Sequence, residues 1–187
     1  MFKSELDDHI SVFKNLESLE SSIDELIGCA VNVLSGKRKI IFAGNGGSAA
    51  DAQHIATEFT VKFSTKRAAL PAISLATDTS ALTAIGNDFG FDYVFSRQLE
   101  AIGTEGDLLI LISTSGQSRN LIECACVAQS MGLTTFGLLG CDGGKLKGEC
   151  DKSIIVSDFT TARIQEAHIF ILHYLISSVE RILYHAR

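Results

Sequence analysis

The sequence predicts a three-layer α/β fold, in which helices cover both faces of a five-stranded parallel sheet. Continuous apolar runs, such as residues 107–113, recur along the chain and are typical of strands buried on both faces. Segments with helical periodicity separate these runs, an alternation that builds doubly wound sheets. No Gly/Ser-rich linker divides the 187 residues, so we expect one domain, with a helical segment at 1–35 and an α/β sandwich at 36–187.

The first element is an N-terminal helix. Apolar residues spaced by three and four run through residues 3–35, which predicts a long amphipathic helix. Because this helix precedes the first strand, its apolar face must pack outside the sheet or against another subunit.

The remaining elements follow in alternation. Five apolar runs are the expected strands, at residues 39–44, 71–76, 107–113, 134–140 and 152–157. Five segments of helical pattern are the expected helices, at residues 48–63, 79–87, 93–103, 118–132 and 161–184. This succession fits a doubly wound sandwich with a flavodoxin-like strand order.

Composition narrows the class of protein. Apolar residues make up 46% and charged residues 20% of the chain, which indicates a globular protein. The net charge is −6 and no Lys/Arg-rich run occurs, so we expect no nucleic-acid partner. The polar N-terminus and the lack of a long apolar stretch predict a cytoplasmic protein without a membrane partner. Five cysteines without a CxxC pair are expected to be reduced and mostly buried.

Two loops follow expected strands, where ligands bind in open α/β sheets. The loop after residues 107–112 carries four hydroxyl side chains at the start of a helix: Ser113, Thr114, Ser115 and Ser118. Hydroxyl groups beside the free N–H groups and the positive dipole end of a helix favour phosphate. Ordinary helix capping is the alternative, but it needs one hydroxyl group and not four. This loop is therefore the predicted phosphate cradle.

The loop after the first strand reads Gly44-Asn45-Gly46-Gly47-Ser48. It lacks the patterns of nucleotide phosphate loops and of dinucleotide-binding turns, so the sequence does not support NTP or NAD binding. Glycines without a side chain still allow the backbone to approach a ligand closely.

Histidines and one carboxylate complete the candidate residues. His54 and Glu58 are four residues apart and share a helix face, although such a pair alone is more often a surface contact than a metal site. His173 lies in an apolar run, where a lone histidine is commonly a core residue. His9 and His168 are expected to be structural or surface residues.

Four stretches together carry a family resemblance: GNGGSAADAQHIATEF, TAIGNDFGF, ISTSGQS and ARIQEAHIFILHYL. They resemble the bacterial phosphoheptose isomerases of the sugar isomerase (SIS) domain superfamily, in the family's order and over residues 35–184. The resemblance implies a flavodoxin-like SIS sandwich that assembles as a homotetramer, with active sites at subunit interfaces. It also implies a phosphorylated heptose as the substrate.

The resemblance assigns roles by position. It implies substrate contacts from Asn45, Gly46, Gly47, Ser48, Glu58, Asn87, Asp88, Ser113, Thr114, Ser115, Ser118 and Gln165. It implies a Zn²⁺ ligand set of His54, Glu58, Gln165 and His173, with Glu58 and His173 as the catalytic acid/base pair. Gln165 and His173 lie eight residues apart, about 12 Å along a helix. Both must lean toward one ion, or one of them comes from a neighbouring subunit.

The implied activity converts sedoheptulose 7-phosphate to D-glycero-D-manno-heptose 7-phosphate through an enediol, the first step toward activated heptose for lipopolysaccharide or capsule. A carboxylate and a histidine suit the proton transfers, and zinc would polarise the carbonyl. Two alternatives are a non-catalytic SIS adaptor of the DnaA-binding type and an isomerase of another phosphosugar. Glu58 and His173 favour an enzyme, because such adaptors tend to replace them. Lys62 stands where the family often has Arg, which bears on sugar preference.

Overall fold

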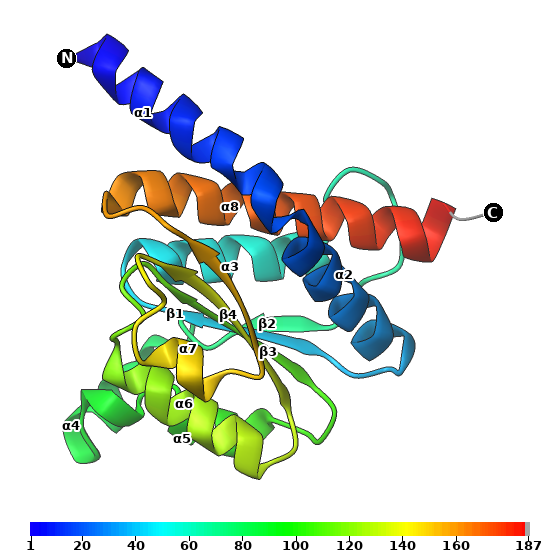
Figure 1. Cartoon of the computed structure of the whole chain (residues 1–187). Helices are drawn as coiled ribbons and strands as arrows, with labels where there is room; N and C mark the ends of the chain where they lie inside the picture. Colours follow the sequence, from blue (N-terminus) through cyan, green and yellow to red (C-terminus); the bar gives the residue numbers. More distant parts are fainter. Residues whose placement is uncertain (186–187) are drawn as a thin grey trace.

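A five-stranded, all-parallel sheet forms the centre of the molecule. The computed structural model describes the backbone of residues 1–185 and the side chains of residues 1–184. The strands are β1 (Ile40–Gly44), β2 (Ala72–Ser74), β3 (Leu108–Ser113), β4 (Thr134–Gly140) and β5 (Lys152–Val156). They pair in the order β2-β1-β3-β4-β5, which confirms the predicted doubly wound, flavodoxin-like arrangement (Figure 1).

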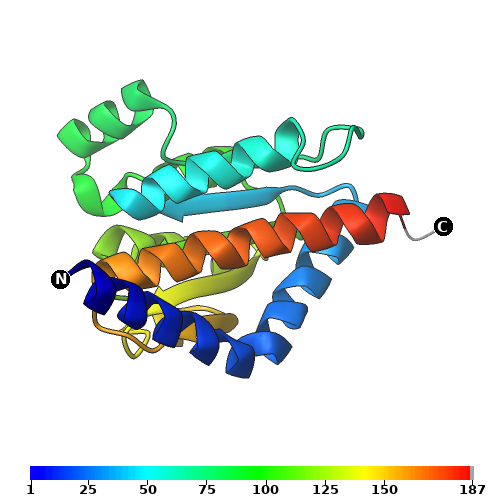
Figure 2. The same cartoon turned by 90° about the horizontal axis from the view of Figure 1, so that it is seen from above.

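Helices cover both faces of this sheet. They are α1 (Phe2–Asn15), α2 (Glu20–Ser35), α3 (Gly47–Thr60), α4 (Thr79–Asp88), α5 (Ser96–Ile102), α6 (Arg119–Ser130), α7 (Leu146–Glu149) and α8 (Thr161–Glu180). Two short 3-10 segments, η1 (Leu16–Leu19) and η2 (Phe91–Tyr93), and a π-helical turn, η3 (Arg181–His185), complete the chain. Helices α2, α3 and α8 lie on one face, and α5, α6 and α7 on the other (Figures 1 and 2).

The apolar strands have a direct structural reason. In β1, Ile40 and Phe42 point into the core under α2, α3 and α8, whereas Ile41 and Ala43 point into the core under α5 and α6. All four side chains are fully buried. Since successive residues of a strand face opposite sides, a strand covered on both faces must be apolar at every position.

Several element boundaries differ from the sequence prediction. The N-terminal segment is not one helix, because it turns at η1, after which α2 packs on the sheet while α1 points away from it (Figure 1). Helix α3 ends at Thr60 and not at Phe63, since Phe63 donates its N–H to Glu180 Oε1 at 3.0 Å. The final α-helix likewise ends at Glu180 and continues as the π-helical turn η3. The second strand has only three residues, and η2 and the short α7 were not predicted.

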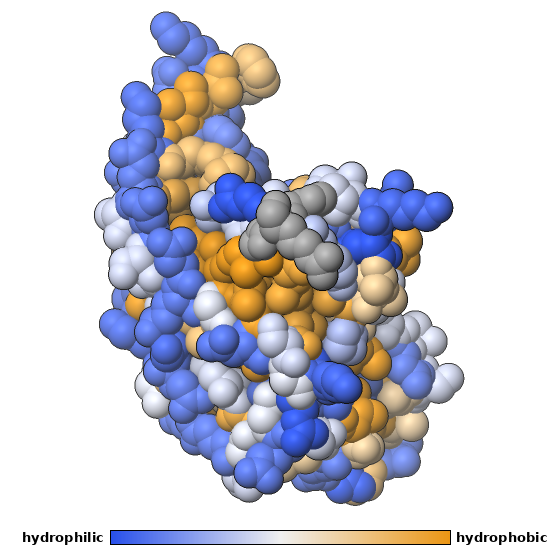
Figure 3. Space-filling view, turned by 90° about the vertical axis from the view of Figure 1, so that its right-hand side faces the viewer, coloured by the Kyte–Doolittle hydropathy of each residue, from blue (hydrophilic) through white to orange (hydrophobic). Residues whose placement is uncertain are grey.

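Apolar side chains remain exposed on the outer helices. In α1, Phe2, Leu6 and Ile10 are 82%, 44% and 41% exposed, and Phe170 and Tyr174 of α8 are exposed beside it. Figure 3 shows apolar surface along this helix and near the middle of the face in view. Within the described residues, no helix combines the length and the apolar character needed to cross a membrane.

Candidate functional site

The parallel pairing of β1 with β3 brings the two candidate loops together. Gly44, the last residue of β1, is in register with Ile112, so both strands end at the same edge of the sheet. A small cavity of about 70 Å³ opens there. Its lining residues are Asn45, Ser48, Ile112, Ser113, Thr114, Ser115, Ser118 and Gln165. This phosphate cradle has room for one small group, and the rest of a larger ligand would extend outside it.

The hydroxyl groups of the cradle are not consumed by helix capping. Ser118 is the N-cap residue of α6, and within the described chain its side chain makes no capping hydrogen bond. Ser113 Oγ accepts from the Gly116 N–H at 3.0 Å, and Ser115 Oγ accepts from the Gln117 N–H at 3.2 Å. Both hydroxyl protons remain available to an anion at the mouth of α6, where the helix dipole favours negative charge.

An amide pair that sequence reasoning missed joins the two loops. Asn45 Nδ2 donates to Asn120 Oδ1 and Asn120 Nδ2 donates to Asn45 Oδ1, both at 2.9 Å. Asn120 is buried in the first turn of α6. The position of Asn120 just after the hydroxyl residues could have indicated a role at the cradle. Its partner Asn45 could not be identified in the same way, because it lies 75 residues away in sequence.

The glycines of the first loop have specific structural reasons. Gly46 has a φ of 56°, a left-handed conformation that glycine adopts without a side-chain penalty. A Cβ atom on Gly47 would lie 2.4 Å from Gln165 Nε2. The backbone favours glycine at position 46, and a side chain at position 47 would displace the end of Gln165, which reaches the cradle from α8.

A second polar group lies further along α3 and α8. His54 Nε2 is 3.4 Å from Glu58 Oε1, and the rings of His54 and His173 meet edge to face with centroids 5.1 Å apart. The Phe63 ring stacks on the His173 ring, with centroids 5.6 Å apart. His173 is thus not an isolated core histidine, because it lies half-buried against the rings of His54 and Phe63.

Only part of the implied zinc ligand set comes together in this chain. His54, Glu58 and His173 supply nitrogen and oxygen donors of the kinds that zinc uses. Gln165 lies at the cradle instead. Among the described residues, no three His, Cys, Asp or Glu side chains are arranged to hold a metal ion. The described residues of one chain therefore do not form a ready zinc site.

Two other candidates lie outside the cradle. Asn87 and Asp88 end α4, where Asn87 Nδ2 donates to Asp88 Oδ1 at 2.7 Å, and both are exposed. Helix α4 stands away from the body of the molecule (Figure 1). Lys62 is exposed in the segment after α3. The structure does not bring Asn87 or Asp88 to the cradle of the same chain.

His9 and His168 follow the sequence expectation, and the cysteines follow it only in part. His9 Nδ1 lies 2.8 Å from Glu166 Oε2, which joins α1 to α8. His168 is fully buried in α8, and this burial lowers the pKa of its imidazole to about 4, so it is neutral at pH 7. All five cysteines are free thiols, but the expectation that most are buried was wrong: only Cys124 is buried, Cys126 is exposed, and Cys29, Cys141 and Cys150 are half-buried.

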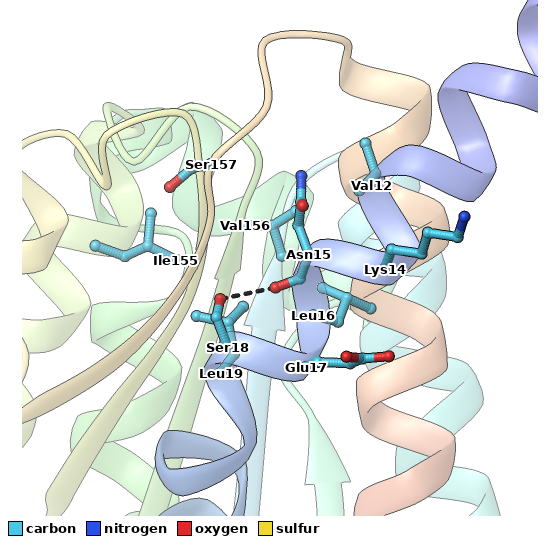
Figure 4. A pocket seen from close by; sticks show the side chains of 10 residues that line it. All are labelled: Val12, Lys14, Asn15, Leu16, Glu17, Ser18, Leu19, Ile155, Val156 and Ser157. Carbon is cyan, nitrogen blue, oxygen red and sulfur yellow. Dashed lines mark hydrogen bonds between the residues drawn. The ribbon is translucent and has the colours of Figure 1, made fainter.

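Larger hollows lie beside the N-terminal helices. They have volumes of about 450 and 460 Å³. Figure 4 shows the first, in which side chains of α1 and η1 face Ile155, Val156 and Ser157. None of the hydroxyl residues of the cradle, nor His54, Glu58 or His173, lines either hollow in the described part of the chain. Because polar side chains converge on the cradle at the carboxyl ends of the strands, where open α/β sheets bind ligands, the cradle is the candidate site.

Known proteins resemble this chain over almost its full length. The sequence model of the SIS domain family matches residues 6–140. The phosphoheptose isomerase of Campylobacter concisus is 48% identical over 180 residues, which cover 96% of this chain and 95% of that protein. Solved structures of phosphoheptose isomerases from Neisseria gonorrhoeae (40% identity, TM-score 0.90) and Francisella tularensis (31% identity, TM-score 0.93) each match over 96% of both chains. A chain this similar in sequence and fold, with the cradle at the expected edge of its sheet, belongs to the phosphoheptose isomerase family of SIS domain proteins.

Proposed function

We propose that this protein isomerises D-sedoheptulose 7-phosphate to D-glycero-D-manno-heptose 7-phosphate. The observation that carries the proposal is that one pair of helices holds both parts of the site. Helix α3 begins at the cradle and carries Glu58, while α8 carries Gln165 at the cradle and His173 beside His54. Gln165 and His173 are about 12 Å apart along the helix. An extended sugar phosphate can therefore reach from the cradle to the acid/base pair.

The chemistry needs two proton-transfer groups. A base removes a proton from C1 of the open ketose, and the electron pair forms the C1–C2 double bond of an enediol. A proton is then delivered to C2, the O1 proton is lost, and O2 gains a proton, so the atoms balance. We assign these transfers to Glu58 and His173, because a carboxylate and an imidazole serve as general acids and bases near neutral pH.

We place the reaction in the cytoplasm, as the first step toward activated heptose for lipopolysaccharide or capsule. Lys62 supports one runner-up, an isomerase of another phosphosugar, since an ammonium group lacks the planar fork of the usual Arg. The presence of both Glu58 and His173 argues against a non-catalytic SIS adaptor. A coupled assay with sedoheptulose 7-phosphate and other phosphosugars distinguishes the three.

The acid/base assignment predicts the effect of two substitutions. Glu58→Gln and His173→Gln should each lower turnover of sedoheptulose 7-phosphate by about 10²- to 10⁴-fold, the usual contribution of such groups. Steady-state kinetics measures this, with circular dichroism to establish folding. Glu100→Gln is the control, because Glu100 is an exposed carboxylate of α5 paired with Arg97 at 2.6 Å. Near-wild-type turnover in both site variants would remove the assignment.

The cradle predicts a loss of phosphate affinity. Removing two hydroxyl groups, in Ser115→Ala with Ser118→Ala, should weaken phosphosugar binding by roughly 10²- to 10⁴-fold, since each hydrogen bond to a charged group contributes about 1.5–3 kcal/mol. Calorimetric titration with sedoheptulose 7-phosphate and with inorganic phosphate measures this. Ser130→Ala at the other end of α6 is the matched control. Unchanged affinity in the double variant would mean that the phosphate binds elsewhere.

We propose Zn²⁺ as the metal of this enzyme, with His54, Glu58, Gln165 and His173 as donors. His54 lies beside Glu58 and beside His173, and Gln165 must turn from the cradle or come from a second copy of the chain. Elemental analysis of purified protein should find about one zinc ion per active site. His54→Ala should weaken zinc binding, and His9→Ala should not. Metal-free protein with full activity in strong chelator would refute metal dependence.

We also propose a homotetramer with active sites built from more than one chain. The exposed apolar residues of α1 and α8, and Asn87 and Asp88 on the outlying α4, support this. Light scattering at micromolar concentration should give four times the chain mass. Leu6→Glu with Ile10→Glu should dissociate the assembly, whereas Ser11→Glu on the polar side of α1 should not. A monomeric wild type would contradict the proposal.

A further inference from the structure

A buried ion pair lies where the two site helices end. Glu180 is the last residue of α8, and Arg67 lies in the loop after α3. Their side chains are each 1% exposed, and Arg67 Nε donates to Glu180 Oε1 at 2.8 Å. Burying a charge pair costs free energy unless further hydrogen bonds satisfy its remaining donor and acceptor atoms. Glu180 and Arg67 both make such hydrogen bonds.

The Glu180 carboxylate holds the loop that follows α3. Phe63 donates its N–H at 3.0 Å, and Ser64 donates its N–H at 3.1 Å and its hydroxyl at 2.8 Å. Thr65 donates from both N–H and hydroxyl at 3.3 Å. Burial alone would raise the pKa of Glu180, but these donors and Arg67 outweigh it and lower the pKa to about 2. The carboxylate is therefore ionised at neutral pH and fixes three consecutive residues of the loop.

The rest of the Arg67 guanidinium binds the end of α3. Its two terminal nitrogens donate to the backbone oxygens of Glu58 and Phe59, each at 2.8 Å, and one also donates to Ala68 O at 2.9 Å. Carbonyls in the last turn of a helix have no partner within the helix and carry its negative dipole end, so a cation is favoured there. Arg67 thus binds the backbone of Glu58 itself.

The same loop also reaches the second acid/base group. Phe63, whose N–H is held by Glu180, stacks its ring on His173 with an interplanar angle of 24°. The His54 ring contacts His173 edge to face. One buried pair therefore connects to Glu58 through Arg67 and to His173 through Phe63.

We infer that Arg67 and Glu180 are a positioning pair, which sets the placement of Glu58 relative to His173 for proton transfer. This inference rests on the proposed isomerase function. Neither residue touches the reacting atoms in this role. Proton transfer depends on geometry, and a misplacement of about 1 Å can cost about 10²-fold in rate, so a pair that fixes both groups affects turnover more than substrate binding.

The chain offers a matched pair that separates positioning from stability. Asp107 is also 1% exposed, lies 2.6 Å from Lys39 Nζ, and accepts the N–H groups of Lys39 and Thr104 at 3.0 and 2.9 Å. It precedes β3, at the opposite edge of the sheet from the cradle. Asp107→Asn and Glu180→Gln therefore make the same chemical change in similar surroundings, and only the second touches the site helices.

The experiment compares these variants by kinetics and by NMR. In Glu180→Gln, the side-chain NH₂ group cannot accept the hydrogen bonds that the loop N–H and hydroxyl groups donate to the carboxylate. Arg67→Lys keeps the charge but loses the planar fork that binds the α3 carbonyls. We expect kcat for sedoheptulose 7-phosphate to fall about 10- to 100-fold in both, with KM little changed. Asp107→Asn should lower the melting temperature but keep wild-type kcat. The imidazole resonances of His173, assigned with His173→Gln, should shift in Glu180→Gln and not in Asp107→Asn.

Different results would overturn the positioning role and the proposed isomerase function. Wild-type kcat and unshifted His173 resonances in a folded Glu180→Gln protein would overturn the positioning role. Should that variant not fold, Phe63→Ala carries the test, because it removes the ring stacked on His173 and leaves the ion pair in place; wild-type kcat there would overturn the role equally. If wild-type protein does not convert sedoheptulose 7-phosphate, the proposed function fails. The His173 resonances then still show whether Glu180 determines the position of the His173 side chain.

Discussion

The structure depends on the parallel pairing of β1 with β3, which are neighbours in the sheet but 68 residues apart at Ile40 and Leu108. Because parallel strands end at one edge, this pairing sets the glycine loop beside the hydroxyl loop. The Asn45–Asn120 amide pair then joins the two loops directly. The free N–H groups and hydroxyl groups of the cradle converge because the backbone register holds them there, and no positively charged side chain lines the cavity in the described residues.

The second constraint is the packing of α3 along α8. Both helices start near the cradle and run in the same direction, with α8 beginning about one turn earlier. Equal steps along the two helices therefore keep residues side by side. This places His54 beside His173, and at the far end it brings Glu180 to the loop after α3. The cradle and the residues proposed for proton transfer therefore lie at different positions along the same two helices. The loop contacts of Glu180 also give a physical reason for the end of α3 at Thr60.

Local patterns predicted the parts of the site that lie within one element. The four-residue spacing of His54 and Glu58 places them on one helix face, and the contact at 3.4 Å follows from that spacing. Contacts between distant segments were not predictable in this way. The Arg67–Glu180 pair spans 113 residues, and nothing in the local pattern marks either residue as a partner of the other. Gln165 and His173 share a helix, yet only the packing decides that one reaches the cradle and the other meets His54.

The sequence by itself determined the order of strands and helices, the continuous apolar character of β1 and β3, and the crowding of hydroxyl groups before α6. These properties repeat with the period of a single helix or strand, or lie within a few consecutive residues. Only the tertiary structure decided the turn at η1, the Asn45–Asn120 pair and the position of Asn87 and Asp88 away from the cradle. The physical reason is that side chains far apart in sequence meet only after the helices have packed on the sheet, and one-dimensional spacing does not record which helices are neighbours.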